Sequence, residues 1–141
     1  MPRRFEVLIC LVVAAFLPLQ AQSVEIIVHP DSDITSVSRT ELSKIFLGKL
    51  RTWADHTPAV PIDQVPGSRA REDFTRWVHD RSVVNVEVYW KRQIFSGRGV
   101  PPPEVTGTAA VIEFVRTHPG AVGYVLEPTT LRGVRRLEVA D

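Results

Sequence analysis

The chain has almost no cysteine and almost no net charge: it contains one cysteine in 141 residues and carries a formal charge of +1. A lone Cys10 gives no disulfide framework, so the fold must rest on a hydrophobic core. Basic and acidic residues number 17 and 16, a balance that does not favour binding to nucleic acid or to an anionic membrane surface.

Motifs for catalysis and metal binding are also missing. The four histidines lie far apart in the sequence, and no two have the spacing of a metal-binding pair. Ser68 is not flanked by the glycines of a Gly-x-Ser-x-Gly nucleophile motif. We therefore expect a protein that is not an enzyme and that holds neither a metal nor a cofactor.

The N-terminus carries the pattern of a secretory signal peptide. Two arginines precede a continuous apolar run over residues 7–17, and small Ala21 follows as a cleavage position. The run is shorter than the roughly 20 residues that span a membrane. We expect residues 1–21 to be removed, leaving one periplasmic domain of residues 22–141 without a membrane span. An uncleaved N-terminal anchor is the alternative.

Runs with strand and helix patterns alternate along the expected domain. Apolar, β-branched runs predict strands over residues 24–28, 59–63, 121–125 and 133–139. Helices are expected after the Ser38 cap as far as Gly48, and over residues 69–80, 84–95 and 109–117. This alternation predicts an α/β domain with a mostly parallel or mixed sheet flanked by helices.

Two details of these elements can be checked against a structure. Gly123 lies inside an expected strand, which indicates a close approach of another chain segment. In the helix over residues 84–95, we expect Val88, Ile94 and Phe95 to face the core.

The start of the helix at residue 69 is the strongest candidate site. The strand over residues 59–63 leads into Gly67, which allows a tight bend, and Ser68, a good N-cap. A helix start offers unpaired N–H groups and a partial positive charge, and Arg69 and Arg71 add cations. The sequence therefore predicts an anion site, with a capped helix and solvated arginines as the alternative.

Five segments in a fixed order indicate a family. They are the strand that ends in His29-Pro30, residues 42–53 (with Ile-Phe-Leu-Gly-Lys and Trp53), the Gly67–Ser68 turn, residues 95–99 (Phe-Ser-Gly-Arg-Gly) and residues 119–125 (Pro-Gly-Ala-Val-Gly-Tyr-Val). In this order the chain resembles the periplasmic phosphate-binding proteins of phosphate ABC transporters, in the type 2 periplasmic-binding-protein superfamily. Those receptors have two lobes that trap the ligand between them, and the resemblance covers one.

The resemblance places the expected anion site but also shows how it differs. Family members read Gly-Ser-Gly-Thr at this helix start. Gly67 and Ser68 match, whereas Arg69 and Ala70 replace the second glycine and the threonine. Gln64 stands where the family often has an arginine.

The resemblance implies a single lobe of a type 2 periplasmic-binding-protein-like fold that binds phosphate or a related small anion. The implied ligand-binding residues are Gly67, Ser68, Arg69, Ala70 and Arg71. Arg98 is a second candidate anion contact, with a structural role, holding backbone carbonyls or a nearby carboxylate, as the alternative. The implied partners are an ABC transporter permease, and a second lobe or second copy that closes the site. The alternative is a protein-interaction module that has lost small-molecule binding.

Overall fold

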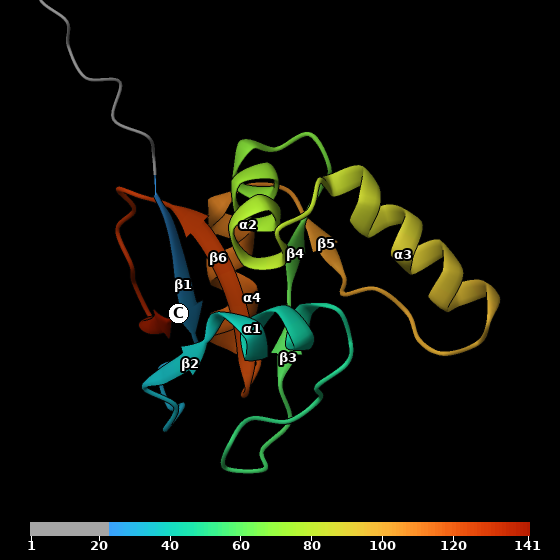
Figure 1. Cartoon of the computed structure of the whole chain (residues 1–141). Coiled ribbons are helices and arrows are strands. Elements are labelled where there is room, and N and C mark those ends of the chain that lie inside the picture. Colours follow the sequence, from blue (N-terminus) through green and yellow to red (C-terminus); the bar gives the residue numbers. More distant parts are fainter. Residues whose placement is uncertain (1–22) are drawn as a thin grey trace, which may run out of the picture.

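The computed structural model describes residues 23–141 (Figure 1). The signal peptide expected over residues 1–21 lies outside this range. Within it, a five-stranded sheet has the order β2-β7-β1-β6-β3. Its strands are β1 (Val24–Val28), β2 (Ser36–Ser38), β3 (Val60–Pro61), β6 (Ala121–Leu126) and β7 (Arg135–Ala140). A separate pair is formed by β4 (Asp63–Gln64) and β5 (Glu104–Val105).

The sheet is mixed, as the sequence predicted. β1 runs antiparallel to both of its neighbours, β6 and β7, whereas β2 is parallel to β7 and β3 is parallel to β6. The helices are α1 (Arg39–Phe46), α2 (Arg69–His79), α3 (Val83–Phe95) and α4 (Thr108–Thr117).

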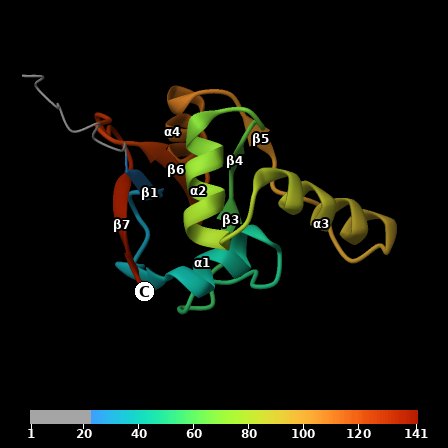
Figure 2. The ribbon, with the colours of Figure 1, turned by 45° about the horizontal axis from the view of Figure 1, so that its top comes forward.

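Alternate residues of the central strands bury on opposite faces of this sheet. Ile26 packs into a core with residues of α1 and α2, while Ile27 packs into a second core with residues of α4. The two views agree that α1 and α2 lie on one side and α4 on the other (Figures 1 and 2). Among the described residues, no helix is long and apolar enough to cross a bilayer.

Two details predicted from the sequence, a helix cap and a close approach at a strand glycine, are confirmed. Ser38 and Glu41 form the expected capping box at the start of α1. At Gly123 the close approach is real, because a Cβ there would lie 2.7 Å from Val111 Cγ1 and 2.9 Å from Ile62 Cγ2.

The strand expected over residues 59–63 divides into two. Ile62 N–H donates to Val122 O, but Asp63 N–H donates to Pro103 O. The chain therefore leaves β6 at Ile62 and joins β5, which carries it out of the main sheet. β4 then leads directly into the turn that precedes α2.

The predicted orientation of α3 is wrong. Val88, Ile94 and Phe95 point away from the core, and Phe95 is 92% exposed. Val86 and Trp90 bury instead, against Leu47. α3 extends away from the rest of the domain (Figure 2), so only one side of it finds a partner. Apolar residues on both sides of the helix gave a pattern that did not identify that side.

Candidate functional site

The turn predicted to bind an anion lies between β4 and α2. Gly67 has φ +92°, a backbone conformation that L side chains rarely adopt. Ser68 is the N-cap, and its Oγ accepts a hydrogen bond of 3.1 Å from the Arg71 N–H. The Ser68 carbonyl accepts the first helical bond, from the Glu72 N–H at 3.1 Å.

Two backbone donors are left at this helix start. Within residues 23–141, no hydrogen-bond acceptor faces the N–H groups of Arg69 and Ala70, as is usual for the first two residues of a helix. The Arg69 side chain is 62% exposed and lies 3.4 Å from the Asp73 carboxylate, one turn along α2. The Ala70 side chain is buried, so only its backbone is available.

Arg71 differs from Arg69, because its side chain is turned inward and is 2% exposed. Its Nη1 donates to Gln64 O at 2.7 Å and lies 3.1 Å from Asp63 Oδ1 and 3.4 Å from Glu104 Oε1. The guanidinium thus balances buried and half-buried carboxylates within the domain.

Asp63 is the centre of this internal network. Its carboxylate accepts hydrogen bonds from the Tyr124 hydroxyl and, at 2.9 Å, from the Gln64 N–H. Burial raises the pKa of Asp63, and the nearby Arg71 charge opposes that rise. Burial, followed by the Asp63 charge, also raises the pKa of Tyr124. The network ties β4, β6 and the first turn of α2 together directly beneath the candidate site.

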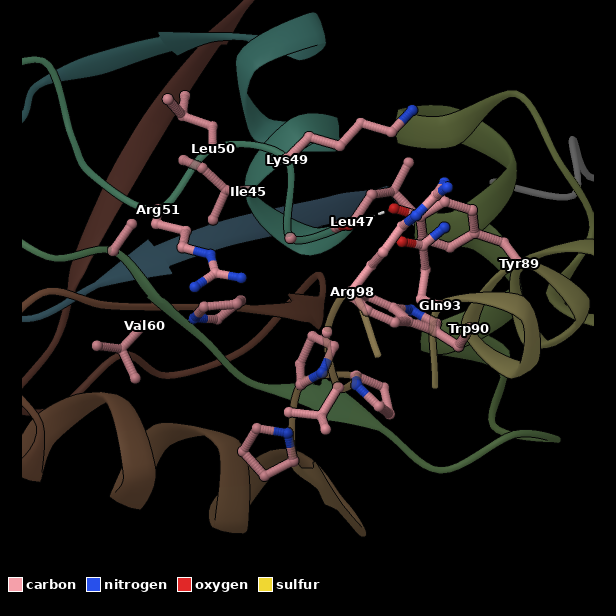
Figure 3. Close-up of a pocket in the computed structure, with 18 residues that line it drawn as sticks. Ile45, Leu47, Lys49, Leu50, Arg51, Val60, Tyr89, Trp90, Gln93 and Arg98 are labelled. Atoms are coloured by element: carbon pink, nitrogen blue, oxygen red, sulfur yellow. Dashed lines mark hydrogen bonds between the residues drawn. The ribbon is translucent and has the colours of Figure 1, made fainter. Parts of the chain in front are cut away.

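Arg98 lies in a different place from the α2 turn. It lines a pocket of about 430 Å³, and none of Gly67 to Arg71 is among the residues that line this pocket. Its walls come from the segment after α1, from β3, from α3 and from residues 98–103 (Figure 3). The structure therefore does not bring the two candidate anion contacts into one site.

The three tryptophans are packed into the domain. Trp53 and Trp90 are buried, and Trp77 is half-buried against the main core. The Trp53 Nε1–H donates to Gly120 O at 3.0 Å. In the described part of the chain, no group of three or more His, Cys, Asp or Glu side chains is placed to hold a metal ion.

Comparison with known families decides the classification. A family model described as a PBP superfamily domain matches residues 14–133. The chain belongs to this family. No curated protein matches the sequence significantly.

Solved structures show the same fold. The PBP domain superposes on an ABC-type phosphate transport receptor from Vibrio cholerae with a TM-score of 0.66 and 16% identity, over 84% of this chain and 46% of that one. A putative phosphate ABC transporter substrate-binding protein with bound phosphate, from Clostridium perfringens, gives a TM-score of 0.64 at 18% identity, over 84% of this chain and 45% of that one. PstS from Borrelia burgdorferi gives a TM-score of 0.64 at 16% identity, over 84% of this chain and 47% of that one.

This chain spans about half the length of these proteins. Membership of the PBP superfamily and the predicted α/β fold are confirmed. At these identities the similarity establishes the fold of the PBP domain but not its ligand.

Sequence reasoning missed the network of Asp63, Tyr124 and Glu104 beneath the turn. Asp63 and Arg71 lie on either side of one strand–helix turn and carry opposite charges, so their pairing could have been predicted from the sequence. Tyr124 and Glu104 come from distant positions, and only the parallel pairing of β4 with β5 and the return of β6 bring them close.

Proposed function

We propose that this PBP domain is a periplasmic solute-binding lobe that binds phosphate or a related small anion at the start of α2. The observation that carries the proposal is the pair of N–H groups at Arg69 and Ala70, which have no acceptor in the described structure, beside the exposed Arg69 guanidinium. Amide donors at a helix start suit an anion, and the Ser68 hydroxyl can add a further donor.

The surroundings of the site set the expected strength of binding. Each exposed charge pair contributes only about 0–1 kcal/mol, and an open site buries little of its ligand. Arg71 adds no direct contact, because its guanidinium is held by Asp63, Gln64 and Glu104. We therefore expect the isolated domain to bind phosphate weakly, with a Kd of about a millimolar, which corresponds to a binding free energy of roughly 4 kcal/mol.

Two fold neighbours support this proposal, because one is described as a phosphate transport receptor and the other as a putative phosphate ABC transporter substrate-binding protein with bound phosphate. In the proposed role, a second lobe, a second copy of the chain or an ABC transporter permease covers the open side of the site. Binding involves no catalytic step.

Calorimetric titration of phosphate into the mature protein, purified from the periplasm, tests the proposal. Arg69→Gln is expected to weaken binding about threefold to fivefold, as loss of one exposed contact would. Arg76→Gln is the matched control, because Arg76 is an exposed arginine of the same helix but lies in its last turn. Absence of binding at about 10 mM phosphate, or equal weakening in the two variants, would count against the proposal.

A second candidate function is a protein-interaction module, and α3 carries the observation in its favour. Val84, Val88 and Phe95 are 64%, 39% and 92% exposed and follow helical spacing along one side of α3. Exposed apolar stripes of this kind often mark contact surfaces.

Photo-crosslinking in the periplasm, from a probe placed at Val88, tests this second function. A probe at Glu113, an exposed residue of α4, is the control. A discrete crosslinked product that only the Val88 probe forms would support an interaction role. No product, or the same product from both positions, would contradict it.

A further inference from the structure

We propose that the pocket between α1, β3 and α3 is a second binding site, for a small organic carboxylate with an aromatic or branched apolar body. It is separate from the anion site at the start of α2, and it carries its own pattern of walls and charges.

The walls of the pocket are apolar and held in place. Trp90 lies in one wall and is 6% exposed. A Cβ at Gly48 would lie 3.0 Å from the Trp90 ring, so the glycine there lets the chain pass close to the indole. The Tyr89 hydroxyl donates to Leu47 O at 2.7 Å, which fixes α3 to the end of α1.

Proline residues complete the apolar lining. Pro61 comes from β3 and Pro101 to Pro103 from the segment that returns from α3. Proline fixes its own backbone φ and has no N–H to leave unpaired, so this wall presents ring surface with few polar groups. Leu47 and Val60 also line the pocket.

The charges at the pocket are all of one sign. Its lining includes Lys49, Arg51 and Arg98, and it includes no aspartate or glutamate. Within residues 23–141, neither Arg51 nor Arg98 has a carboxylate within 4 Å. Arg51 lies on one side of the pocket, and Arg98 lies on the other beside Gln93 and Trp90 (Figure 3).

These features together select the ligand class. A guanidinium can bind a carboxylate through two parallel N–H groups, and Arg51 and Arg98 each supply one guanidinium to the lining. Inorganic phosphate would make little use of the apolar proline and Trp90 lining, whereas a neutral apolar compound would leave Arg51 and Arg98, both exposed, without a carboxylate partner. A pocket of about 430 Å³ is within the roughly 300–1,000 Å³ common for small-molecule sites.

NMR spectroscopy of the mature protein can detect such binding at Trp90 itself. The probe is phenylacetate, and its neutral isostere phenylacetamide is the ligand control. The indole N–H resonance of Trp90, one of three tryptophans, is identified by its loss in Trp90→Phe. We expect phenylacetate to shift this resonance, and phenylacetamide to do so at least threefold less at equal concentration.

Variants separate a charge-selective site from a merely apolar one. Arg51→Gln and Arg98→Gln should each raise the apparent Kd for phenylacetate about threefold to fivefold. Arg92→Gln should leave it unchanged, since Arg92 is an exposed cation of α3 that does not line the pocket. The proposal is overturned if phenylacetate causes no shift at about 10 mM, if phenylacetamide acts equally, or if Arg92→Gln has the same effect as Arg98→Gln.

Discussion

Replacing Arg71 with methionine tests whether this arginine is a structural cation or a ligand contact. The methionine keeps most of the side-chain length but removes the guanidinium that faces Asp63 at 3.1 Å and Gln64 O at 2.7 Å. The Asp63 carboxylate is then left buried with only the Tyr124 hydroxyl and the Gln64 N–H as donors. Because an uncompensated buried charge is costly, we expect a large loss of stability and no direct effect on phosphate contacts.

The magnitude follows from the burial of both partners. Breaking a buried ion pair by removing one partner costs about 3–5 kcal/mol. The contact with Glu104 adds at most about 1 kcal/mol, because that carboxylate is half-exposed. We therefore expect a loss of about 3–5 kcal/mol at pH 7, a large part of the roughly 5–15 kcal/mol that stabilises a typical domain.

The pH dependence of this loss gives a second reading of the same variant. Burial already raises the pKa of Asp63, and removing the Arg71 charge should raise it further. A carboxyl group with a raised folded-state pKa stabilises the fold when protonated, and that contribution is lost as the pH rises through the folded-state pKa. The cost of Arg71→Met should therefore be largest at neutral pH and fall as the pH approaches 4.

Urea unfolding followed by circular dichroism measures these differences. With a slope of about 1–3 kcal/mol per molar urea, the midpoint should fall by more than about 1 M. Asp63→Asn in the Arg71→Met background should recover much of the loss, because the amide oxygen can still accept from Tyr124. A cost below about 1 kcal/mol together with loss of phosphate binding would refute this reasoning and make Arg71 a ligand contact.

Three further outcomes are expected. Burial lowers the pKa of His79 to about 4, so the stability contributed by neutral His79 should be complete above pH 6.5 and be lost as the pH falls toward 4. The urea midpoints measured at pH 7 and pH 4.5 should therefore lie closer together in His79→Gln than in the wild type. An equal fall of the midpoint in both proteins would contradict this. Gly123→Ala should cost about 1–3 kcal/mol, because its Cβ would lie 2.7 Å from Val111, and thermal unfolding should show no comparable cost for Gly99→Ala, where the nearest atom is 3.8 Å away. N-terminal sequencing of the periplasmic protein should start directly after Ala21, and a sequence that starts at the initiator methionine would refute cleavage.

The sequence predicted those parts of the fold that are encoded within one turn or one strand. The capping box of Ser38 and Glu41 needs only neighbours three residues apart, and it formed as expected. Gly123 was informative because a strand seldom carries glycine without a close neighbour. The direction of α3 could not be obtained in this way, since it depends on where Leu47 lies in three dimensions.

The candidate site shows the same division. Gly67 and Ser68 could be recognised because a turn and an N-cap have local residue preferences. The inward direction of Arg71 could not, because Glu104, 33 residues further on, helps to hold it. Arg98 was singled out from the sequence, but the pocket that it lines joins four segments whose proximity depends on the whole fold.

The central claim, anion binding at the start of α2, is tested most directly by following every backbone amide during a phosphate titration by NMR spectroscopy. The account predicts that the amide resonances of Arg69 and Ala70 move most and saturate together, since these N–H groups have no acceptor in the described structure. It also predicts that the Trp90 indole resonance does not follow the same curve. Absence of saturable shifts at Arg69 and Ala70, or larger shifts around Trp90, would contradict the claim.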